Sequence, residues 1–408
     1  MNDLLPPESA KRYAFEKTCR HHFERYGYGE IRTPIVESTA LFLRGIGEAT
    51  DVVEKQMYTF NDLKGRSLTL RPEMTASCVR SYIQHGVGKR NPTTRWFYMG
   101  PMFRYERVQA GRYRQFHQIG VEAFGIAEPT IDAEQIAMLA SIYTDIGIGE
   151  LDVVINSVGN SVDRSRFRDA LLSYFEPHSN DLCADCQRRL KSNPLRVLDC
   201  KKDSPSELVA DSPSVHDYLS LESRAHFDGV QSALADVDVA FRVEERLVRG
   251  LDYYTGTVFE IISKSNALGA QATVVGGGRY DNLVESLGGS PTPAVGFALG
   301  IERNVMCMAG EATEFSRSPD VFIVAWTDVA RCRARALAAE LRGIGIYVEI
   351  EHRPLSAKAQ FKRANKINAR FVATLGDDEL AAGTVNLRNM NSRVESQVAQ
   401  DDIAKSIS

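Results

Sequence analysis

Three arginines stand in segments rich in glycine, aromatic and charged residues. Arg104 follows Gly100-Pro-Met-Phe103, Arg249 opens Arg249-Gly-Leu-Asp-Tyr-Tyr254, and Arg303 closes Gly296-Phe-Ala-Leu-Gly-Ile-Glu-Arg303. A planar guanidinium pairs with phosphate or carboxylate oxygens in a bidentate manner and keeps its charge at any working pH. A single arginine more commonly carries a solvated charge or pairs with a carboxylate. Three of them in such segments indicate a phosphate-binding site, and the sequence contains neither of the common glycine-rich phosphate loops.

A strand-like run places polar side chains at alternating positions. Gln118, Gly120 and Glu122 share one face of such a strand, because successive side chains point to opposite faces. Glycine at the middle position would leave room for a ligand between the two polar side chains. His117 points to the opposite face, where packing is more common than catalysis. The face of Gln118 and Glu122 is therefore predicted to be the floor of a pocket.

Three of the seven cysteines lie close together in the sequence. Cys183 and Cys186 have C-x2-C spacing, Cys200 follows them, and His178 is nearby. Thiolates and an imidazole are zinc ligands, so these four residues could hold a metal. An odd number of cysteines scattered through a long chain is otherwise typical of reduced thiols.

The bulk composition limits the class of protein. A chain of 408 residues predicts about two to three domains, and 43% hydrophobic with 25% charged residues is typical of soluble globular proteins. The sequence has neither a secretory leader nor an apolar span long enough for a bilayer, which favours the cytoplasm and no membrane contact. With a formal net charge of −4, any RNA contact must use local basic patches.

Hydrophobic spacing predicts the elements that position these residues. Apolar residues recur at helical spacing up to Gly27, and a strand is expected at 30–36. Residues 52–124 and 258–298 favour strands that pair in an antiparallel manner. Between them, 150–237 shows one strand and then mostly helical pattern, which we interpret as an insertion.

The C-terminal part of the sequence has a different hydrophobic pattern. A polar linker at 311–319 precedes 320–408, where strands and helices alternate as in a small α/β domain. Lys358, Lys362 and Lys366 share one face of an expected helix, beside Arg363, and could contact nucleic-acid phosphates; a solvated face is the alternative. The predicted fold class is α+β, with an antiparallel core sheet, a helical insertion and a C-terminal α/β domain.

The arginine segments carry a family resemblance. With Leu70-Arg-Pro-Glu-Met-Thr75, Gly111-Arg-Tyr-Arg-Gln-Phe-His-Gln118 and Gly277-Gly-Arg-Tyr-Asp281, they resemble the motifs of class II aminoacyl-tRNA synthetases. Residues 249–254 resemble the signature of histidyl-tRNA synthetases, and the likeness covers nearly the whole chain. It implies a histidine–tRNA ligase that forms histidyl-adenylate from ATP and L-histidine and transfers histidine to tRNA(His), releasing AMP and diphosphate.

The resemblance also implies an organisation and a set of ATP ligands. Residues 1–310 would be the catalytic domain, interrupted at 150–237 by a domain that contacts the acceptor arm, and 320–408 would bind the anticodon in a cytoplasmic homodimer. Arg249, Arg104 and Arg303 would be catalytic. ATP would contact Arg104, Glu106, Arg112 and Arg303, with Mg²⁺ between its distal phosphates and no metal held by protein side chains.

The remaining roles concern histidine and tRNA. The resemblance assigns histidine to Glu73, Thr75, Arg104, Gln118, Glu122, Arg249, Tyr253, Tyr254 and Tyr280. It assigns the 5′ end and discriminator base of the tRNA to Arg107 and Gln109, for which plain surface polarity is the alternative. Ordinary packing is the alternative for the tyrosines, and an ion pair with Arg71 or Arg80 is the alternative for Glu73.

Two rival functions share the motifs in part. A non-catalytic histidine-sensing regulatory paralogue would lose synthetase motifs, so the complete segment 249–254 and residues 320–408 argue against it. A synthetase for proline, threonine or glycine would leave Glu122 and Tyr254 without a polar ring to meet.

The sequence departs from the family pattern at Met74, where glycine is common, and at Val108, where proline is common. It also begins abruptly, which leaves open a start upstream.

Overall fold

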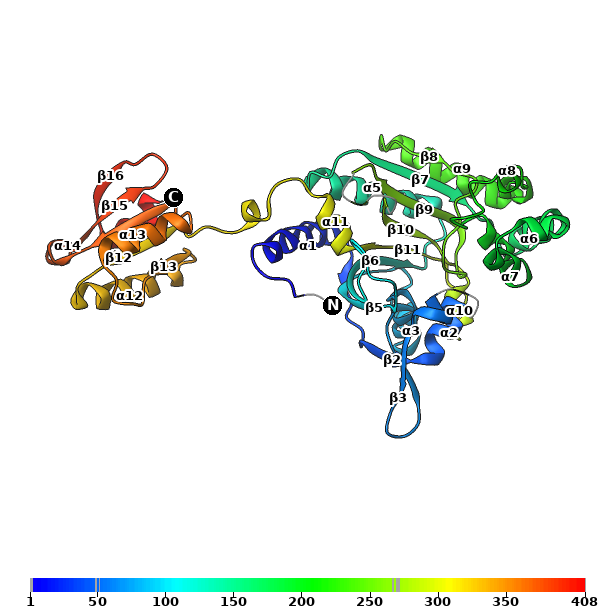
Figure 1. Cartoon of the computed structure of the whole chain (residues 1–408), viewed down its shortest axis with the longest axis horizontal. Coiled ribbons are helices and arrows are strands. Elements are labelled where there is room, and N and C mark those ends of the chain that lie inside the picture. The colour runs from blue at the N-terminus through cyan, green and yellow to red at the C-terminus, as the bar shows by residue number, and fades with distance from the viewer. Residues whose placement is uncertain (1–2, 48–49, 51, 266–267, 269–271, 408) are drawn as a thin grey trace. The chain divides into compact units, whose positions relative to one another are not determined.

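The computed structural model describes residues 3–47, 50, 52–265, 268 and 272–407. Met1 and Asn2, on which the question of an upstream start depends, lie outside the described residues. The chain divides into two compact units, Met1–Glu311 and Ala312–Ser408, each with its own sheet (Figure 1).

The first unit is built on a sheet of eight strands. Its six central strands are antiparallel, as the sequence predicts, and a short parallel strand is added at each edge. In spatial order the strands are β1 (Gly29–Glu30), β5 (Thr94–Phe103), β6 (Gln115–Phe124), β11 (Ala294–Gly300), β10 (Thr273–Arg279), β9 (Thr255–Ser263), β7 (Leu151–Ser157) and β8 (Arg242–Val243).

Helices cover one face of this sheet (Figure 1). They are α1 (Glu8–Arg25), α5 (Pro129–Asp145), α9 (Leu221–Asp236) and α11 (Ile301–Cys307). The first helix buries Phe15, Cys19 and Phe23 completely, and Phe23 packs on Phe97 of the sheet at 5.2 Å between ring centroids. This helix ends before Gly27, whose positive φ of 78° a side chain would disfavour. The opposite face is left open for a site.

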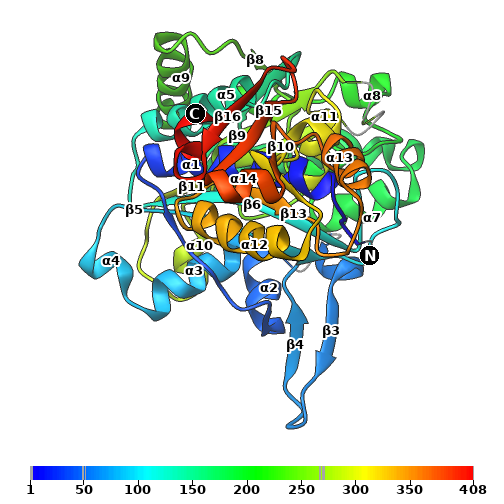
Figure 2. The same ribbon diagram turned by 90° about the vertical axis from the view of Figure 1, so that its left-hand side faces the viewer.

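A smaller layer closes one end of the sheet. It contains α2 (Thr39–Ile46), the π-helix η1 (Val52–Gln56), α3 (Thr75–Gln84), α4 (Val87–Arg90), α10 (Leu283–Ser286) and a sheet of β2 (Val36–Ser38), β4 (Ser67–Leu70) and β3 (Tyr58–Asn61). The hairpin β3–β4 projects from this layer (Figure 2).

The prediction of a single strand at 30–36 is wrong. It is divided between β1 and β2, which belong to different sheets. Pro34 has no N–H to give to a strand ladder, and the guanidinium of Arg71 donates to the carbonyl oxygen of Thr33 at 2.9 Å instead.

The insertion is narrower than the predicted range 150–237. Strand β7 at its start pairs with β9 inside the main sheet, and α9 at its end packs on α5 and β9. Between them lies a helical body with an apolar core of its own. Its elements are α6 (Ser161–Phe175), η2 (Glu176–Asp181), α7 (Ala184–Ser192), η3 (Pro194–Val197), α8 (Glu207–Ala210) and η4 (Val215–Tyr218).

The second unit is a five-stranded mixed sheet with helices. The strand order is β13 (Val348–Ile350), β12 (Val321–Ala325), β14 (Phe371–Leu375), β15 (Thr384–Asn389) and β16 (Glu395–Ala399). The helices are η6 (Ala312–Phe315), α12 (Asp328–Gly343), α13 (Ala357–Lys366), α14 (Asp377–Ala382), η7 (Gln400–Asp402) and α15 (Ile403–Ser406). The predicted helix with three lysines is α13, and all three are exposed, whereas Arg363 pairs with Glu351 at 2.7 Å. In the described part of the chain, each helix is too short or too polar to cross a bilayer.

Candidate active site

The open face of the large sheet carries a cleft of about 720 Å³, a volume that suits small-molecule ligands. It gathers every residue that the sequence assigned to histidine or ATP: Glu73, Thr75, Arg104, Glu106, Arg112, Gln118, Glu122, Arg249, Tyr253, Tyr254, Tyr280 and Arg303. Arg107 and Gln109 lie outside it and are exposed on the loop that follows Arg104.

At one end of the cleft, which we call the acidic end, Glu122 lies in a cage of neutral donors. One carboxylate oxygen accepts a hydrogen bond from the Thr75 hydroxyl at 2.7 Å, and the other accepts one from the hydroxyl of Tyr280. The side chain is almost completely buried. Burial disfavours the charged form and raises the pKa of Glu122 to about 8.

Glu73 completes the acidic end. Its two carboxylate oxygens accept the backbone N–H groups of Thr75 at 2.7 Å and Ala76 at 2.9 Å, so it caps the first turn of α3. Burial also raises the pKa of this carboxyl group. The alternative of an ion pair with Arg71 or Arg80 is not what the structure shows, because Arg80 pairs with Glu37 at 2.8 Å and Arg71 binds backbone carbonyl groups.

Three tyrosines form the wall between the two ends. The ring centroids of Tyr253 and Tyr254 are 4.7 Å apart, and those of Tyr253 and Tyr280 are 5.7 Å apart. Burial raises the pKa of all three hydroxyl groups, so they remain donors at neutral pH. Packing alone does not describe Tyr280, since its hydroxyl holds Glu122.

The neighbour of Tyr280 fixes its position. Arg279 turns away from the cleft and pairs with Asp132 of α5 at 2.6 Å, and both side chains are buried. Successive residues of a strand point to opposite faces, so anchoring Arg279 behind the sheet directs Tyr280 toward the cleft.

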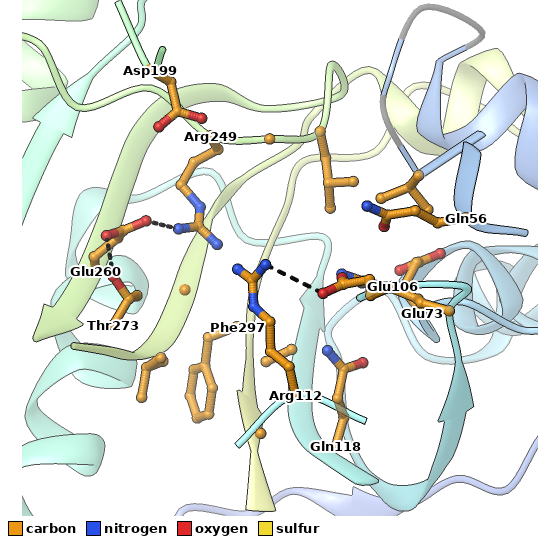
Figure 3. Close-up of a pocket in the computed structure, with 18 of the residues that line it drawn as sticks. Gln56, Glu73, Glu106, Arg112, Gln118, Asp199, Arg249, Glu260, Thr273 and Phe297 are labelled. Carbon is orange, nitrogen blue, oxygen red and sulfur yellow. Dashed lines mark hydrogen bonds and ion pairs between the residues drawn. The ribbon is translucent and has the colours of Figure 1, made fainter. Parts of the chain in front are cut away.

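Four arginines, Arg104, Arg112, Arg249 and Arg303, form the other end, which we call the arginine end. Arg249 donates to Glu260 of β9, and Figure 3 shows the two side chains pointing toward one another. Burial disfavours its charge, but the carboxylate of Glu260 outweighs this effect and holds the pKa of Arg249 above its ordinary value. The guanidinium lies close to Gly276, where a Cβ atom would come within 1.8 Å of it. Any side chain at this point of β10 would therefore displace Arg249.

The other three arginines of this end are held by a carboxylate or by backbone carbonyl groups. Arg112 pairs with Glu106 at 3.3 Å, and Figure 3 shows the two side chains pointing toward one another. Arg104 donates to the Pro72 carbonyl oxygen at 2.8 Å. Arg303 donates to the carbonyl oxygens of Gly111 and Thr273 at 3.3 and 3.0 Å. These contacts fix the guanidinium groups around the cleft before a ligand arrives.

The floor of the cleft differs from the prediction at its centre. Gln118 and Glu122 line the cleft together, but a Cβ atom at Gly120 would lie 2.4 Å from the ring of Tyr98. The space that Gly120 leaves is thus filled by the Tyr98 ring and not by a ligand. Among the described residues, the buried side-chain oxygen of Gln118 has no hydrogen-bond partner, as suits a group that waits for a ligand.

His117 lies away from the cleft, as alternation along the strand predicts. Its backbone N–H and its ring bind the carboxylate of Glu302 at 3.0 and 2.9 Å. The two departures from the family pattern have different surroundings: Met74 packs in a buried cluster with Tyr98 and Tyr280, and Val108 is exposed.

Several cleft residues escaped the sequence analysis. Glu260 was detectable, because it is the charged residue within the apolar run 258–262. Asp199 lies near Arg249 in Figure 3 and comes from the helical body, whose sequence shows no periodic signal that would place it at a cleft. Tyr98 was hidden in an aromatic run that reads as ordinary core.

The cysteine prediction was wrong in one ligand. Cys183, Cys186 and Cys200 come together, but the ring of His178 is half exposed and lies 3.7 Å from Asp181. The fourth potential ligand of the group is Asp203.

Known proteins resemble this chain over its whole length. A family model described as histidyl-tRNA synthetase matches residues 1–173 and 186–303, and one described as an anticodon binding domain matches residues 320–408. The histidine–tRNA ligase of Bacillus licheniformis is 47% identical over 99% of this chain and 96% of its own length. That of Anoxybacillus flavithermus is 48% identical over 97% and 95%. The apo structure of S. aureus histidyl-tRNA synthetase superposes with a TM-score of 0.83 at 37% identity, over 100% of this chain and 98% of that one.

Proposed function

Because the chain belongs to the histidyl-tRNA synthetase family and charges tRNA with histidine, we propose that histidine and ATP meet in this cleft, with histidine at the acidic end and the phosphates at the arginine end. The observation that carries the proposal is the cage around Glu122, because a buried carboxyl group between two hydroxyl groups suits an imidazole N–H. The comparisons give the alternative of a regulatory paralogue no support.

Recognition of histidine follows from the surroundings of Glu122. Thr75 and Tyr280 hold the carboxyl group in place, and an imidazole N–H would supply the donor that favours its charged form. Tyr254 would bind the other ring nitrogen, and Glu73 with Thr75 the α-ammonium group. Arg249 and the side-chain N–H of Gln118 would donate to the carboxylate. An apolar amino acid would leave these buried groups unpaired, which rejects it by about 10⁴- to 10⁵-fold without an editing site.

Activation of histidine then depends on charge. The histidine carboxylate attacks the α-phosphorus of ATP and diphosphate leaves, so negative charge develops on oxygens in the transition state. Arg104 and Arg249 would face the α-phosphate, and Arg112 and Arg303 the distal phosphates. Glu106 holds Arg104 and Arg112 in place through ion pairs, and Glu260 holds Arg249. Arg303 is held by the carbonyl oxygens of Gly111 and Thr273. Bound Mg²⁺ would supply further neutralisation at the distal phosphates.

The tRNA would extend over both units. Arg107 and Gln109 are exposed beside the cleft and offer donors and acceptors to base edges. The helical body between β7 and α9 would contact the acceptor arm, and the exposed lysines of α13 would contact anticodon phosphates. We further propose a homodimer in the cytoplasm, as the family motifs imply; light scattering of the purified chain would test its assembly.

The proposal is tested by ATP–pyrophosphate exchange with each proteinogenic amino acid in turn. The wild-type chain is expected to exchange with histidine alone. Tyr280→Phe removes the hydroxyl that holds Glu122 and is expected to raise the KM for histidine more than that for ATP. Exchange with another amino acid, or a Tyr280→Phe variant with an unchanged KM for histidine, would contradict the placement of histidine at the acidic end.

A further inference from the structure

A cluster of metal-ligating side chains lies in the helical body, outside the reacting groups of the cleft. Cys183, Cys186, Cys200 and Asp203 each offer one ligand atom, and these atoms all lie within 4.8 Å of one another. The four residues form two pairs with identical spacing, C-x2-C followed by C-x2-D. Paired ligands at this spacing are typical of structural zinc sites.

The distance between two of the sulfur atoms decides between a disulfide and a metal. Cys183 Sγ and Cys200 Sγ are 3.7 Å apart, whereas a disulfide needs about 2.05 Å. A zinc ion bound by thiolates at about 2.3 Å holds any two of them about 3.8 Å apart on a tetrahedron. The separation of these two sulfur atoms is therefore that of two ligands on one zinc ion.

The surroundings support bound thiolates. Cys186 is fully buried and Cys200 nearly so. One carboxylate oxygen of Asp203 accepts the N–H of Cys183 at 3.0 Å, which turns that carboxylate toward the sulfurs. Burying such groups without a partner is costly, and a metal provides that partner.

We propose that Cys183, Cys186, Cys200 and Asp203 bind a structural Zn²⁺ ion that fixes one wall of the catalytic cleft. Three thiolates and a carboxylate make a soft tetrahedral set, which favours zinc over magnesium or calcium. The set brings four negative charges to two positive ones. Lys201 and Lys202, between the third and fourth ligands, supply nearby positive charge.

The link to the cleft is the segment 193–203. Its start is tied to the loop of Arg249 to Tyr254, since Asn193 donates to Asp252 at 2.8 Å and Arg196 to the Gly250 carbonyl oxygen at 2.9 Å. Its end, from Asp199 to Lys202, lines the cleft directly. Zinc would join this end to α7, so both ends of the segment would be fixed.

The first experiment measures zinc in the full chain purified under reducing conditions, by mass spectrometry of the metal. We expect about one zinc per chain. After the zinc has been removed by chelation, added Co²⁺ should give an absorption spectrum with intense thiolate-to-metal bands and tetrahedral d–d bands. A chain that binds neither zinc nor cobalt, binds another metal in preference, or carries a disulfide between these cysteines would overturn the proposal, and none of these results depends on a variant.

Variants then locate the site. Cys186→Ser and Asp203→Asn are expected to lose or weaken zinc binding, to lower the melting temperature and to slow exchange, because the cleft wall loosens. Cys332→Ser is the matched control, since Cys332 is exposed on α12 in the other unit. Full zinc content in soluble Cys186→Ser, or equal zinc loss in Cys332→Ser, would contradict the assignment.

Discussion

The two ends of the cleft are built on opposite physical principles. At the acidic end, Glu73 and Glu122 are buried and accept hydrogen bonds from hydroxyl and N–H groups, so desolvation governs their protonation. At the arginine end, guanidinium groups face Glu106 and Glu260, so charge governs the site. With the ligands placed as proposed, the difference separates two tasks: the neutral network would select an amino acid by its hydrogen bonds, and the fixed cations would stabilise a transition state.

The largest effect should come from the arginine end. In the proposed mechanism Arg249 faces the α-phosphate, so Arg249→Ala removes a preorganised cation and is expected to lower the rate of ATP–pyrophosphate exchange by about 10²- to 10³-fold. Arg32→Ala is the control, because Arg32 is exposed and pairs with Glu30 at the surface. An unchanged exchange rate in folded Arg249→Ala protein would remove Arg249 from the mechanism.

A second variant breaks the acidic end. Tyr280→Phe leaves one oxygen of Glu122 without its donor and is expected to raise the KM for histidine by about 10- to 100-fold. This is the cost of losing a hydrogen bond to a carboxyl group that becomes charged when histidine binds. Steady-state exchange measures this, with exposed Tyr13→Phe as the control. A loss of kcat at constant KM would show that the two ends do not divide the work in this way.

The pH dependence of stability sharpens the contrast. Burial raises the pKa of Glu122 to about 8, whereas an unfolded carboxyl group titrates near 4.5. Between these values the folded chain holds a proton that the unfolded chain has lost. Burial of the neutral carboxyl group thus contributes to the free energy of unfolding. The contribution is fully present below pH 4.5 and is lost as the pH rises through 8.

Denaturant unfolding from about pH 6 to pH 8 should therefore show a steeper decline in wild type than in Glu122→Gln, by up to about 1.4 kcal/mol per pH unit. The amide keeps the shape of the side chain and does not titrate. Parallel pH profiles for the two proteins would show that Glu122 is charged throughout this range.

The smallest effect is expected at the solvated rim of the arginine end. Arg112 is 37% exposed and pairs with Glu106, so water already competes for its charge. Arg112→Ala should raise the KM for ATP only about two- to fivefold in exchange assays. A loss as large as that expected for Arg249→Ala would show that exposure does not set the weight of each arginine.

The sequence predicted most of the elements that carry the cleft, for identifiable reasons. Alternation located β6, and the helical spacing of Phe15, Cys19 and Phe23 located α1. The sequence pattern failed at residues 30–36, where Pro34 and the carbonyl contacts of Arg71 divide one apparent strand between two sheets. Contacts between distant residues decided that outcome, and local pattern does not contain them.

The same limit applies to the site. Every residue that the family resemblance assigned to histidine or ATP lines the cleft. Gly120 was assigned to a ligand because the pattern gave no sign that Tyr98 of the neighbouring strand would fill its space. Asp203 was overlooked in favour of His178, although its spacing from Cys200 repeats that of Cys183 and Cys186. Both errors concern which partner a residue meets, which depends on tertiary packing.

The division of the cleft is tested most directly by equilibrium dialysis of histidine, without ATP, against wild type, Tyr280→Phe and Arg303→Ala. Tyr280→Phe should weaken histidine binding by about 10-fold or more. Arg303→Ala should change it less than about twofold, because its backbone contacts with Gly111 and Thr273 lie at the other end. The reverse order, with Arg303→Ala losing histidine and Tyr280→Phe retaining it, would contradict the account.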